Sequence, residues 1–147
     1  PGGYVAGIRL GQLKVKARVV EKDKPGGVCL NVGCIPSKAL ITASKYFDKL
    51  KYGSDMGLLA DNLRVDMQKM QAWKGEVVTK LTGGVRQLLK ANGCDYLTGT
   101  ATLVGPRTVQ IQAAAANGAD KGVTTAQADN IVLSTGARPI EVPGFKF

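Results

Sequence analysis

The sequence predicts an α/β fold, in which helices cover a parallel sheet that continues into a small antiparallel β-meander. Three observations indicate this class. A short amphipathic segment runs directly into a strand-like one within residues 5–21. Two longer stretches with helical periodicity follow at 39–50 and 66–91, and the hydrophobic period changes to two after Gly93.

The first predicted elements are a helix over residues 5–13 and a strand over 15–20. The helix follows a glycine turn at Gly2 and Gly3, and the strand ends at Glu21. A glycine turn, helix, strand and acid in this order form the second half of a dinucleotide-binding βαβ unit, whose acid bonds a ribose hydroxyl. Because the first strand and the first glycines of that unit are absent, we expect the chain to be an excerpt of a longer polypeptide.

Two long helices are predicted in the middle of the chain, separated by a glycine-containing break at 53–57. The first lies beyond Pro36, and the second runs from Asp66, as its N-cap, to Ala91. The apolar stripe expected on the first consists of Ala39, Leu40, Ala43, Tyr46, Phe47 and Leu50. The buried face expected on the second consists of Val77, Val78, Leu81, Val85, Leu88 and Leu89, with Met70 and Trp73 packed beside it.

Strands are predicted over 94–98 and 108–112, joined by a turn at 105–107. Cys94 is expected to be an ordinary core residue. The run 113–122 is typical of a surface hairpin tip.

A last buried strand is predicted over 129–134. It would deliver Ser134, Thr135 and Gly136 at its carboxyl end, where ligands of parallel sheets collect.

The composition is that of a folded globular chain, with 44% hydrophobic and 21% charged residues. No apolar run reaches the ~18 residues that span a bilayer, so no membrane partner is expected. The net charge of +9 comes from lysines and arginines spread along the chain, without a dense basic block, so no nucleic-acid partner is expected either. With no histidine, a metal site would need cysteines and carboxylates alone, and none is predicted.

Residues 26–38 read GGVCLNVGCIPSK and place two thiols, Cys29 and Cys34, five positions apart. In an undistorted helix the Cα atoms of such a pair are roughly 8.6 Å apart, whereas disulfides seldom tolerate more than ~7 Å. If the two thiols bond, the helix must be distorted there or begin between them, and Gly33 allows this. A buried, unbonded pair at a helix start is the alternative.

Lys38 lies one helical turn beyond Cys34. Its charge and a nearby helix N-terminus are expected to stabilise thiolate over thiol. Three cysteines are too few for a secreted disulfide scaffold, so a cycling pair in a reducing compartment is favoured. The cytoplasm is the expected location, and the mitochondrial matrix is also compatible.

Residues 26–38 closely resemble the active-disulfide motif of the flavin-dependent pyridine nucleotide-disulfide oxidoreductases, in their dihydrolipoamide dehydrogenase branch. Residues 1–4 are similar to the end of the FAD phosphate loop of that family, and 134–139 to its second FAD motif. Leu30, Ile35 and Ser37 favour this branch over glutathione and mercuric reductases. The resemblance implies a Rossmann-like FAD-binding domain, incomplete at both ends, over residues 1–147.

The resemblance also implies residue roles. Cys29 would be the interchange thiol, Cys34 the thiol that faces the flavin, and Lys38 a neighbour of the flavin N5 side; these three are the implied catalytic residues. Glu21 would hold the adenosine ribose. The implied FAD-binding residues are Gly2, Gly3, Glu21, Lys22, Gly27, Val28, Cys29, Cys34, Lys38, Gly99, Ala101, Ser134, Thr135 and Gly136. One departure is Lys14, which stands where the family has a helix-ending glycine.

The implied activity is the oxidation of dihydrolipoamide to lipoamide with NAD⁺, through FAD and a Cys29–Cys34 disulfide. The implied partners are the lipoyl domain of a 2-oxo acid dehydrogenase or glycine cleavage complex and a second copy in a homodimer. NAD would bind a domain that, like the dimer-interface domain and an acid-base His-Glu pair, lies downstream of residue 147. Residues 1–147 alone are therefore expected to be inactive. A glutathione- or mercuric-reductase type of enzyme and a non-catalytic flavin-binding module are the alternatives.

Overall fold

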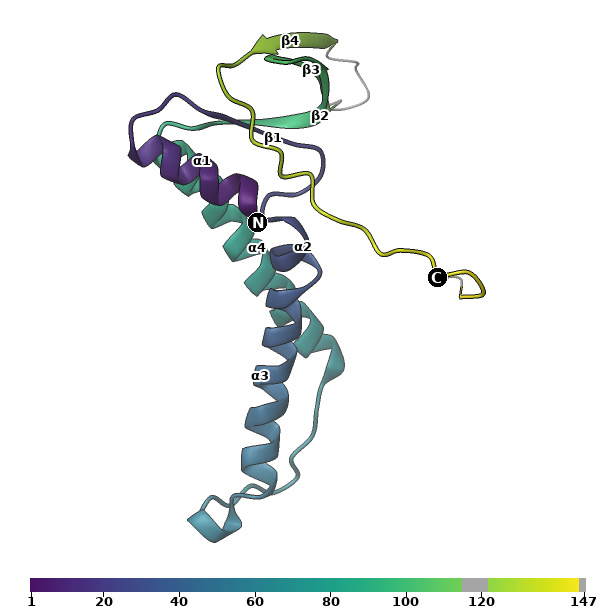
Figure 1. The fold of residues 1–147 in the computed structure, drawn as a ribbon. Coiled ribbons are helices and arrows are strands. Elements are labelled where there is room, and N and C mark those ends of the chain that lie inside the picture. Colours follow the sequence, from purple (N-terminus) through teal and green to yellow (C-terminus); the bar gives the residue numbers. More distant parts are fainter. Residues whose placement is uncertain (115–121, 146–147) are drawn as a thin grey trace.

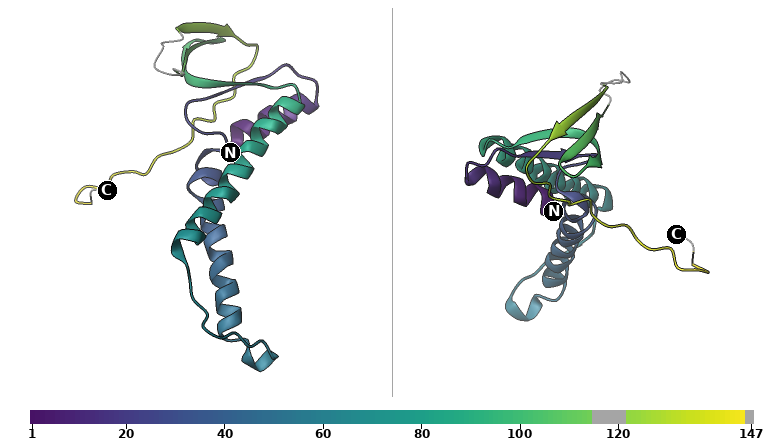
Figure 2. Two further views of the ribbon diagram at one scale, coloured as in Figure 1. Left: turned by 180° about the vertical axis from the view of Figure 1, so that it is seen from behind. Right: turned by 45° about the horizontal axis from the view of Figure 1, so that its top comes forward.

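The computed structural model describes residues 1–114 and 122–145, and it confirms the α/β class (Figure 1). The elements in chain order are α1 (Gly2–Gln12), β1 (Arg18–Glu21), α2 (Gly27–Asn31), α3 (Cys34–Lys51), the 3₁₀ turn η1 (Ser54–Met56), α4 (Met67–Ala91), β2 (Asp95–Gly105), β3 (Thr108–Ala113) and β4 (Val123–Gln127). The sheet lies at one end, with α1 and α4 against it, while α3 and much of α4 project away from it side by side (Figures 1 and 2).

The sheet has the order β1-β2-β3-β4 and changes character along β2. The first part of β2 pairs in parallel with β1, from Arg18 opposite Asp95 to Glu21 opposite Thr98. From Gly99 onward β2 pairs antiparallel with β3, which pairs antiparallel with β4. The predicted parallel pairing, the meander and the turn at 105–107 are confirmed. The hairpin tip predicted at 113–122 lies mostly outside the described residues.

Gly99 marks the point where β2 leaves its parallel partner. A Cβ built on this residue would lie 2.5 Å from the carbonyl oxygen of Gln112 on β3. Since real Cβ atoms do not approach an oxygen so closely, the two strands can pair here only around a residue without a side chain.

The core lies where α1, α2 and α4 meet the parallel strands, and its buried members are Leu30, Val85, Leu89 and Cys94. Helix α1 approaches this core through two glycines. A Cβ on Gly7 would lie 2.7 Å from Cγ2 of Val19, and one on Gly11 would overlap the carbonyl oxygen of Asn92. Neither glycine was predicted to pack so closely, although their i, i+4 spacing along one helix face was a signal for it.

Helix α1 ends at Gln12 and is followed by a left-handed turn at Lys14, the position where the resemblance implies a glycine. The Lys14 amide donates to the Gly11 carbonyl at 2.9 Å and the Val15 amide to the Leu10 carbonyl at 3.0 Å. These two bonds form the helix-ending motif that needs a left-handed residue, and Lys14 has a φ of 61°. The exposed lysine therefore occupies a backbone conformation that glycine adopts more easily.

Replacing Lys14 by glycine is expected to raise the free energy of unfolding by about 1 kcal/mol, because the left-handed conformation costs other residues about that much. Urea denaturation of the two proteins measures the difference. Lys16→Gly is the matched control, since Lys16 is also an exposed loop lysine but has no positive φ. An equal gain in both variants would contradict the assignment of strain to Lys14.

The helix boundaries follow the predicted signals. Asp66 caps α4, where its Oδ1 accepts a hydrogen bond from the Lys69 amide at 3.0 Å. Pro36 lies in the first turn of α3, where its missing N–H costs no helical hydrogen bond. The predicted helix 5–13 begins earlier, at Gly2, and the predicted strand 15–20 is shortened to Arg18–Glu21.

The burial predicted for the two long helices is only partly confirmed. Val85 and Leu89 are buried, and Ala39 is buried on α3. The predicted core residues that are exposed instead are Tyr46, Leu50, Trp73, Leu81 and Leu88. Far from the sheet, α3 and α4 have only each other as neighbours, which leaves much of their surface uncovered (Figure 2). Leu88 is different: it adjoins the fully buried Leu89 and is exposed because it lies on another face of α4.

The prediction of a last strand over residues 129–134 is wrong. The structure assigns no strand to these residues, and Val132 and Leu133 are exposed. An extended segment becomes a strand only when a neighbour supplies hydrogen bonds, and no described strand pairs with this one. Within the described residues, none of the helices has the length and apolar character needed to cross a membrane.

Candidate active site

The two thiols lie on either side of a break between two helices. Cys29 is in the middle of α2, and Cys34 is the first residue of α3. The amides of Val32 and Gly33 both donate to the Val28 carbonyl, at 3.0 and 2.7 Å, and this ends α2. Gly33 has φ −116° and ψ −106°, far from helical values, and starts the chain in a new direction. The chain therefore has the break between the thiols that the spacing requires of a bonded pair, although the two thiols are not bonded here.

Both cysteines are free thiols in this structure, with Cys29 half-buried and Cys34 exposed. The pKa of Cys29 is raised, first by the hydrogen bond that its thiol makes with Cys34, then by partial burial and by the electrostatic interaction with Cys34. The Lys38 charge lowers the pKa of Cys29, but by less. The predicted stabilisation of thiolate is therefore wrong for Cys29 in the dithiol, because the nearby Cys34 outweighs Lys38.

A second group of predicted residues meets where α1 begins. A Cβ on Gly3 would lie 3.3 Å from Cβ of Ser134, and one on Gly2 would lie 3.5 Å from Oγ of the same serine. Gly27, at the start of α2, has a φ of 62°, and a Cβ on it would lie 3.1 Å from the nitrogen of Pro1. The starts of α1 and α2 and the segment around Ser134 thus come together through glycines.

The backbone amides of the first turn of α1 lie at this meeting point. Helix α1 has no side-chain cap, so the amides of its first turn have no partner within the helix. Amides at a helix N-terminus bind phosphate groups readily. Val28 follows Gly27 on α2 and is exposed, while Thr135 and Gly136 follow Ser134 in the exposed extended segment.

The third group lies at the carboxyl ends of the parallel strands. Glu21 ends β1, and its Oε1 accepts a hydrogen bond from the Asp23 amide at 3.0 Å. Lys22 is exposed beside it, and Gly99 follows Thr98, the strand partner of Glu21. Ala101 lies further along β2 within the meander, so it is set apart from the other candidates.

One residue that positions the site was not predicted. The side-chain amide of Asn31 donates to the carbonyls of Pro25 and Gly27, at 3.0 and 2.9 Å, and so ties the end of α2 to the preceding turn. The signal was an asparagine one turn after a glycine pair, since asparagine bonds readily to nearby backbone groups.

Cys94 has the ordinary core role predicted for it. It is buried, and burial, followed by the charge of Asp95, raises the pKa of its thiol. It is therefore not a third reactive thiol.

Comparison with known proteins shows the family to which the chain belongs. The family model described as pyridine nucleotide-disulphide oxidoreductase matches residues 1–146. The chain belongs to the pyridine nucleotide-disulphide oxidoreductase family. Similar relatives of this chain are oxidoreductase enzymes named dihydrolipoyl dehydrogenase. That of Geobacillus stearothermophilus is 50% identical over 147 residues, and that of Halobacterium salinarum is 48% identical over 148; each match covers 100% of this chain and 30% of the relative.

A solved structure of similar fold is that of LpdA from Mycobacterium tuberculosis. It superposes with a TM-score of 0.80 at 21% identity, over 96% of this chain and 31% of that one. This likeness shows the fold, and the Rossmann-like assignment agrees with it. The chain spans about 30% of the length of the curated family members that it matches.

Proposed function

We propose that residues 1–147 form most of the FAD-binding domain of a dihydrolipoamide dehydrogenase, whose NAD-binding and dimer-interface domains lie outside these residues. The observation that carries the proposal is the placement of Cys29 and Cys34 across a helix break, with Cys29 on the same short helix as Gly27. Gly27 in turn lies against the start of α1, whose first-turn amides have no partner within the helix and could bind phosphate. A redox pair next to a dinucleotide site is what a flavin disulfide oxidoreductase requires.

The residues fit FAD at three places. The first-turn amides of α1, with Gly2, Gly3, Gly27 and Ser134 around them, would bind the two phosphates. Glu21 would accept a hydrogen bond from the adenosine ribose, with Lys22 and Gly99 beside it. The role of Ala101 on this side rests on the resemblance alone, because Ala101 lies apart within the meander. The residues proposed along the flavin side are Val28, Cys29, Cys34, Lys38, Thr135 and Gly136. When bound, FAD supplies the two-electron acceptor beside the thiol pair.

The thiol chemistry that we propose is disulfide exchange. A thiolate of dihydrolipoamide attacks the Cys29 sulfur of a Cys29–Cys34 disulfide, and Cys34 leaves as a thiolate. The second substrate thiolate then attacks the substrate sulfur of the mixed disulfide, which forms lipoamide and releases Cys29. One disulfide breaks and one forms, so the substrate loses two electrons to the pair. Lys38 favours release of Cys29 as a thiolate, since its charge lowers the pKa of that thiol.

The dihydrolipoamide would be carried on a lipoyl domain of a 2-oxo acid dehydrogenase or glycine cleavage complex, and the complete enzyme would be a homodimer that reduces NAD⁺. The direct test is to count thiols in the complete protein that carries this chain, before and after mild reduction. A gain of two thiols, together with lipoamide-dependent NADH formation, is expected. No gain would instead indicate a non-catalytic flavin-binding module.

FAD is expected to protect Cys34 from alkylation more than Cys29. In flavin-free protein, iodoacetamide should reach Cys34 first, because Cys34 is exposed whereas Cys29 is half-buried and has a raised pKa. Since Cys34 is the thiol proposed to face the flavin, added FAD should slow its labelling several-fold. Peptide mass mapping measures both rates, with buried Cys94 as the internal control. Protection of Cys29 alone would reverse the assigned roles.

A further inference from the structure

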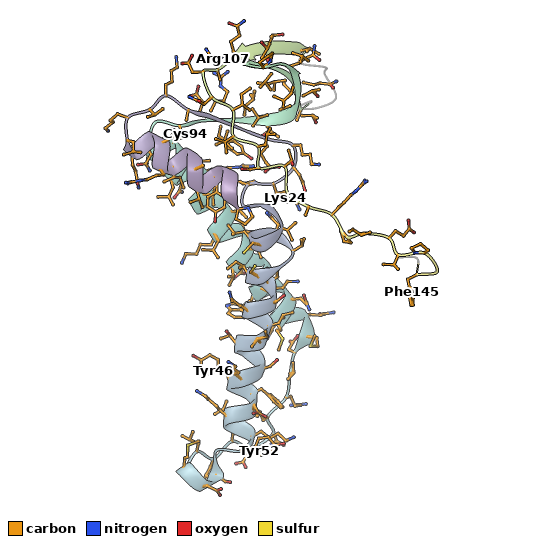
Figure 3. The ribbon with its side chains drawn as sticks, in the orientation of Figure 1. Lys24, Tyr46, Tyr52, Cys94, Arg107 and Phe145 are labelled. Carbon is orange, nitrogen blue, oxygen red and sulfur yellow. The ribbon has the colours of Figure 1, made fainter. Side chains whose placement is uncertain are left out.

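A separate pocket lies between the loop that follows β1, helix α2 and one face of α4, with a volume of about 220 Å³. The lining residues used below are Lys24, Pro25, Asn31, Gly83 and Arg86. Lys24 is in the loop between β1 and α2 (Figure 3). Asn31 also positions α2 in the thiol site, but no other lining residue belongs to the flavin or thiol site proposed above, so the pocket has no assigned role.

The pocket is bounded by two cations from different parts of the chain. Within residues 1–114 and 122–145 the ion pairs are Arg18–Asp95 and Arg107–Asp129, so neither Lys24 nor Arg86 has a carboxylate partner there. No acidic residue lines the pocket. Two unpaired cations that converge on one small volume favour an anion in it.

Contacts outside the pocket position Arg86 and the turn that carries Lys24. The guanidinium carbon of Arg86 lies 5.6 Å from the centre of the Tyr96 ring, and this contact with β2 limits how the arginine can turn. On the opposite side, the two hydrogen bonds from Asn31 to the Pro25 and Gly27 carbonyls fix the turn that carries Lys24 and Pro25. These contacts position Arg86 and the backbone of the turn before an anion binds, which lowers the entropy cost of binding for this part of the site.

The rest of the lining combines apolar surface with the polar side chains of Asn31, Thr79 and Thr82. The Pro25 ring forms part of the wall, and Gly83 presents bare helix backbone. A Cβ built on Gly83 would meet no atom within 4 Å, so the backbone of α4 is directly accessible there. The volume is smaller than the roughly 300–1,000 Å³ of most ligand pockets, so the occupant must be small.

We propose that this pocket binds a small organic anion. Its carboxylate or phosphate group lies between Lys24 and Arg86, and its apolar body rests on Pro25 and the backbone at Gly83. A guanidinium paired with an ammonium suits either group, because charge-assisted hydrogen bonds to both are strong.

The test is calorimetric titration of phenyl phosphate into the complete protein that carries this chain, with FAD in excess so that no flavin-phosphate site is open to the probe. Saturable binding is expected, with inorganic phosphate and phenol each binding more weakly. Arg86→Gln should raise the Kd about tenfold or more, since it removes a hydrogen-bonded charge. Lys90→Gln, which removes one charge from the same helix outside the pocket, should leave the Kd unchanged.

Two glycine variants distinguish an effect on the pocket from an effect on the stability of the fold. Gly83→Ala should weaken binding of phenyl phosphate about tenfold by placing a methyl group on the pocket floor, while Gly84→Ala should not. An added Cβ would meet open space at both glycines, and only Gly83 lines the pocket. Both variants should raise the Tm, because alanine favours the helix.

Several outcomes would overturn the proposal: no saturable binding by the wild type, equal weakening by Gly83→Ala and Gly84→Ala, or phenol binding as tightly as phenyl phosphate. FAD binding, followed by its visible absorbance, is a separate readout. Failure of the anion site would therefore leave the flavin proposal standing.

Discussion

Replacing Cys34 by alanine is expected to lower the pKa of the Cys29 thiol and to abolish dihydrolipoamide oxidation by the complete enzyme. The pKa of Cys29 is raised first by its hydrogen bond with Cys34 and third by its electrostatic interaction with that residue, and the variant removes both causes. Partial burial, which raises the pKa, and Lys38, which lowers it, remain. The thiolate fraction of Cys29 near neutral pH therefore rises, although the pair can no longer form a disulfide.

The measurement is the rate of iodoacetamide labelling of Cys29 against pH, which should have its midpoint at a lower pH in Cys34→Ala than in the reduced wild type. Adding Lys38→Met should move the midpoint back up, since it removes the charge that lowers the pKa. Cys94→Ala is the control and should change neither the midpoint nor turnover. A midpoint that does not move would show that Cys34 does not control the protonation of Cys29.

Replacing Gly11 by alanine is expected to lower the free energy of unfolding by about 1–3 kcal/mol, the usual cost of overpacking. The new Cβ would overlap the backbone carbonyl of Asn92, so the turn between α4 and β2 would have to move. This cost exceeds the gain of up to about 1 kcal/mol that alanine brings to a helix. Gly7→Ala should cost less, because its Cβ meets only side-chain atoms of Val19, Leu89 and Cys94.

Gly84→Ala is the matched control for Gly11→Ala. Gly84 is also inside a helix, but a Cβ there would meet no atom within 4 Å. The same substitution should therefore stabilise the protein by about 0.5–1 kcal/mol. Urea denaturation of the three proteins measures both effects, and effects of the same sign at Gly11 and Gly84 would contradict the packing that we describe for α1.

Much of the fold and of the candidate site could be predicted because it depends on residues close together in the chain. Asp66 bonds the amide three residues later, so the start of α4 was recognisable from a few letters. The spacing of Cys29 and Cys34 excluded a straight helix between bonded thiols, and Gly33 breaks the helix there. The motif in 26–38 likewise indicated the family before any contact was known.

The sequence by itself therefore determined the α/β class, the helix break at the thiols, the helix caps and the family. Only the tertiary structure decided which helix faces are covered, since Leu88 is exposed although the adjacent Leu89 is fully buried. It also decided that Gly7 and Gly11 carry the packing of α1, that 129–134 is not a strand, and that Cys34 outweighs Lys38 at Cys29. Each of these depends on which atoms are neighbours in space, and local periodicity and spacing do not specify such neighbours.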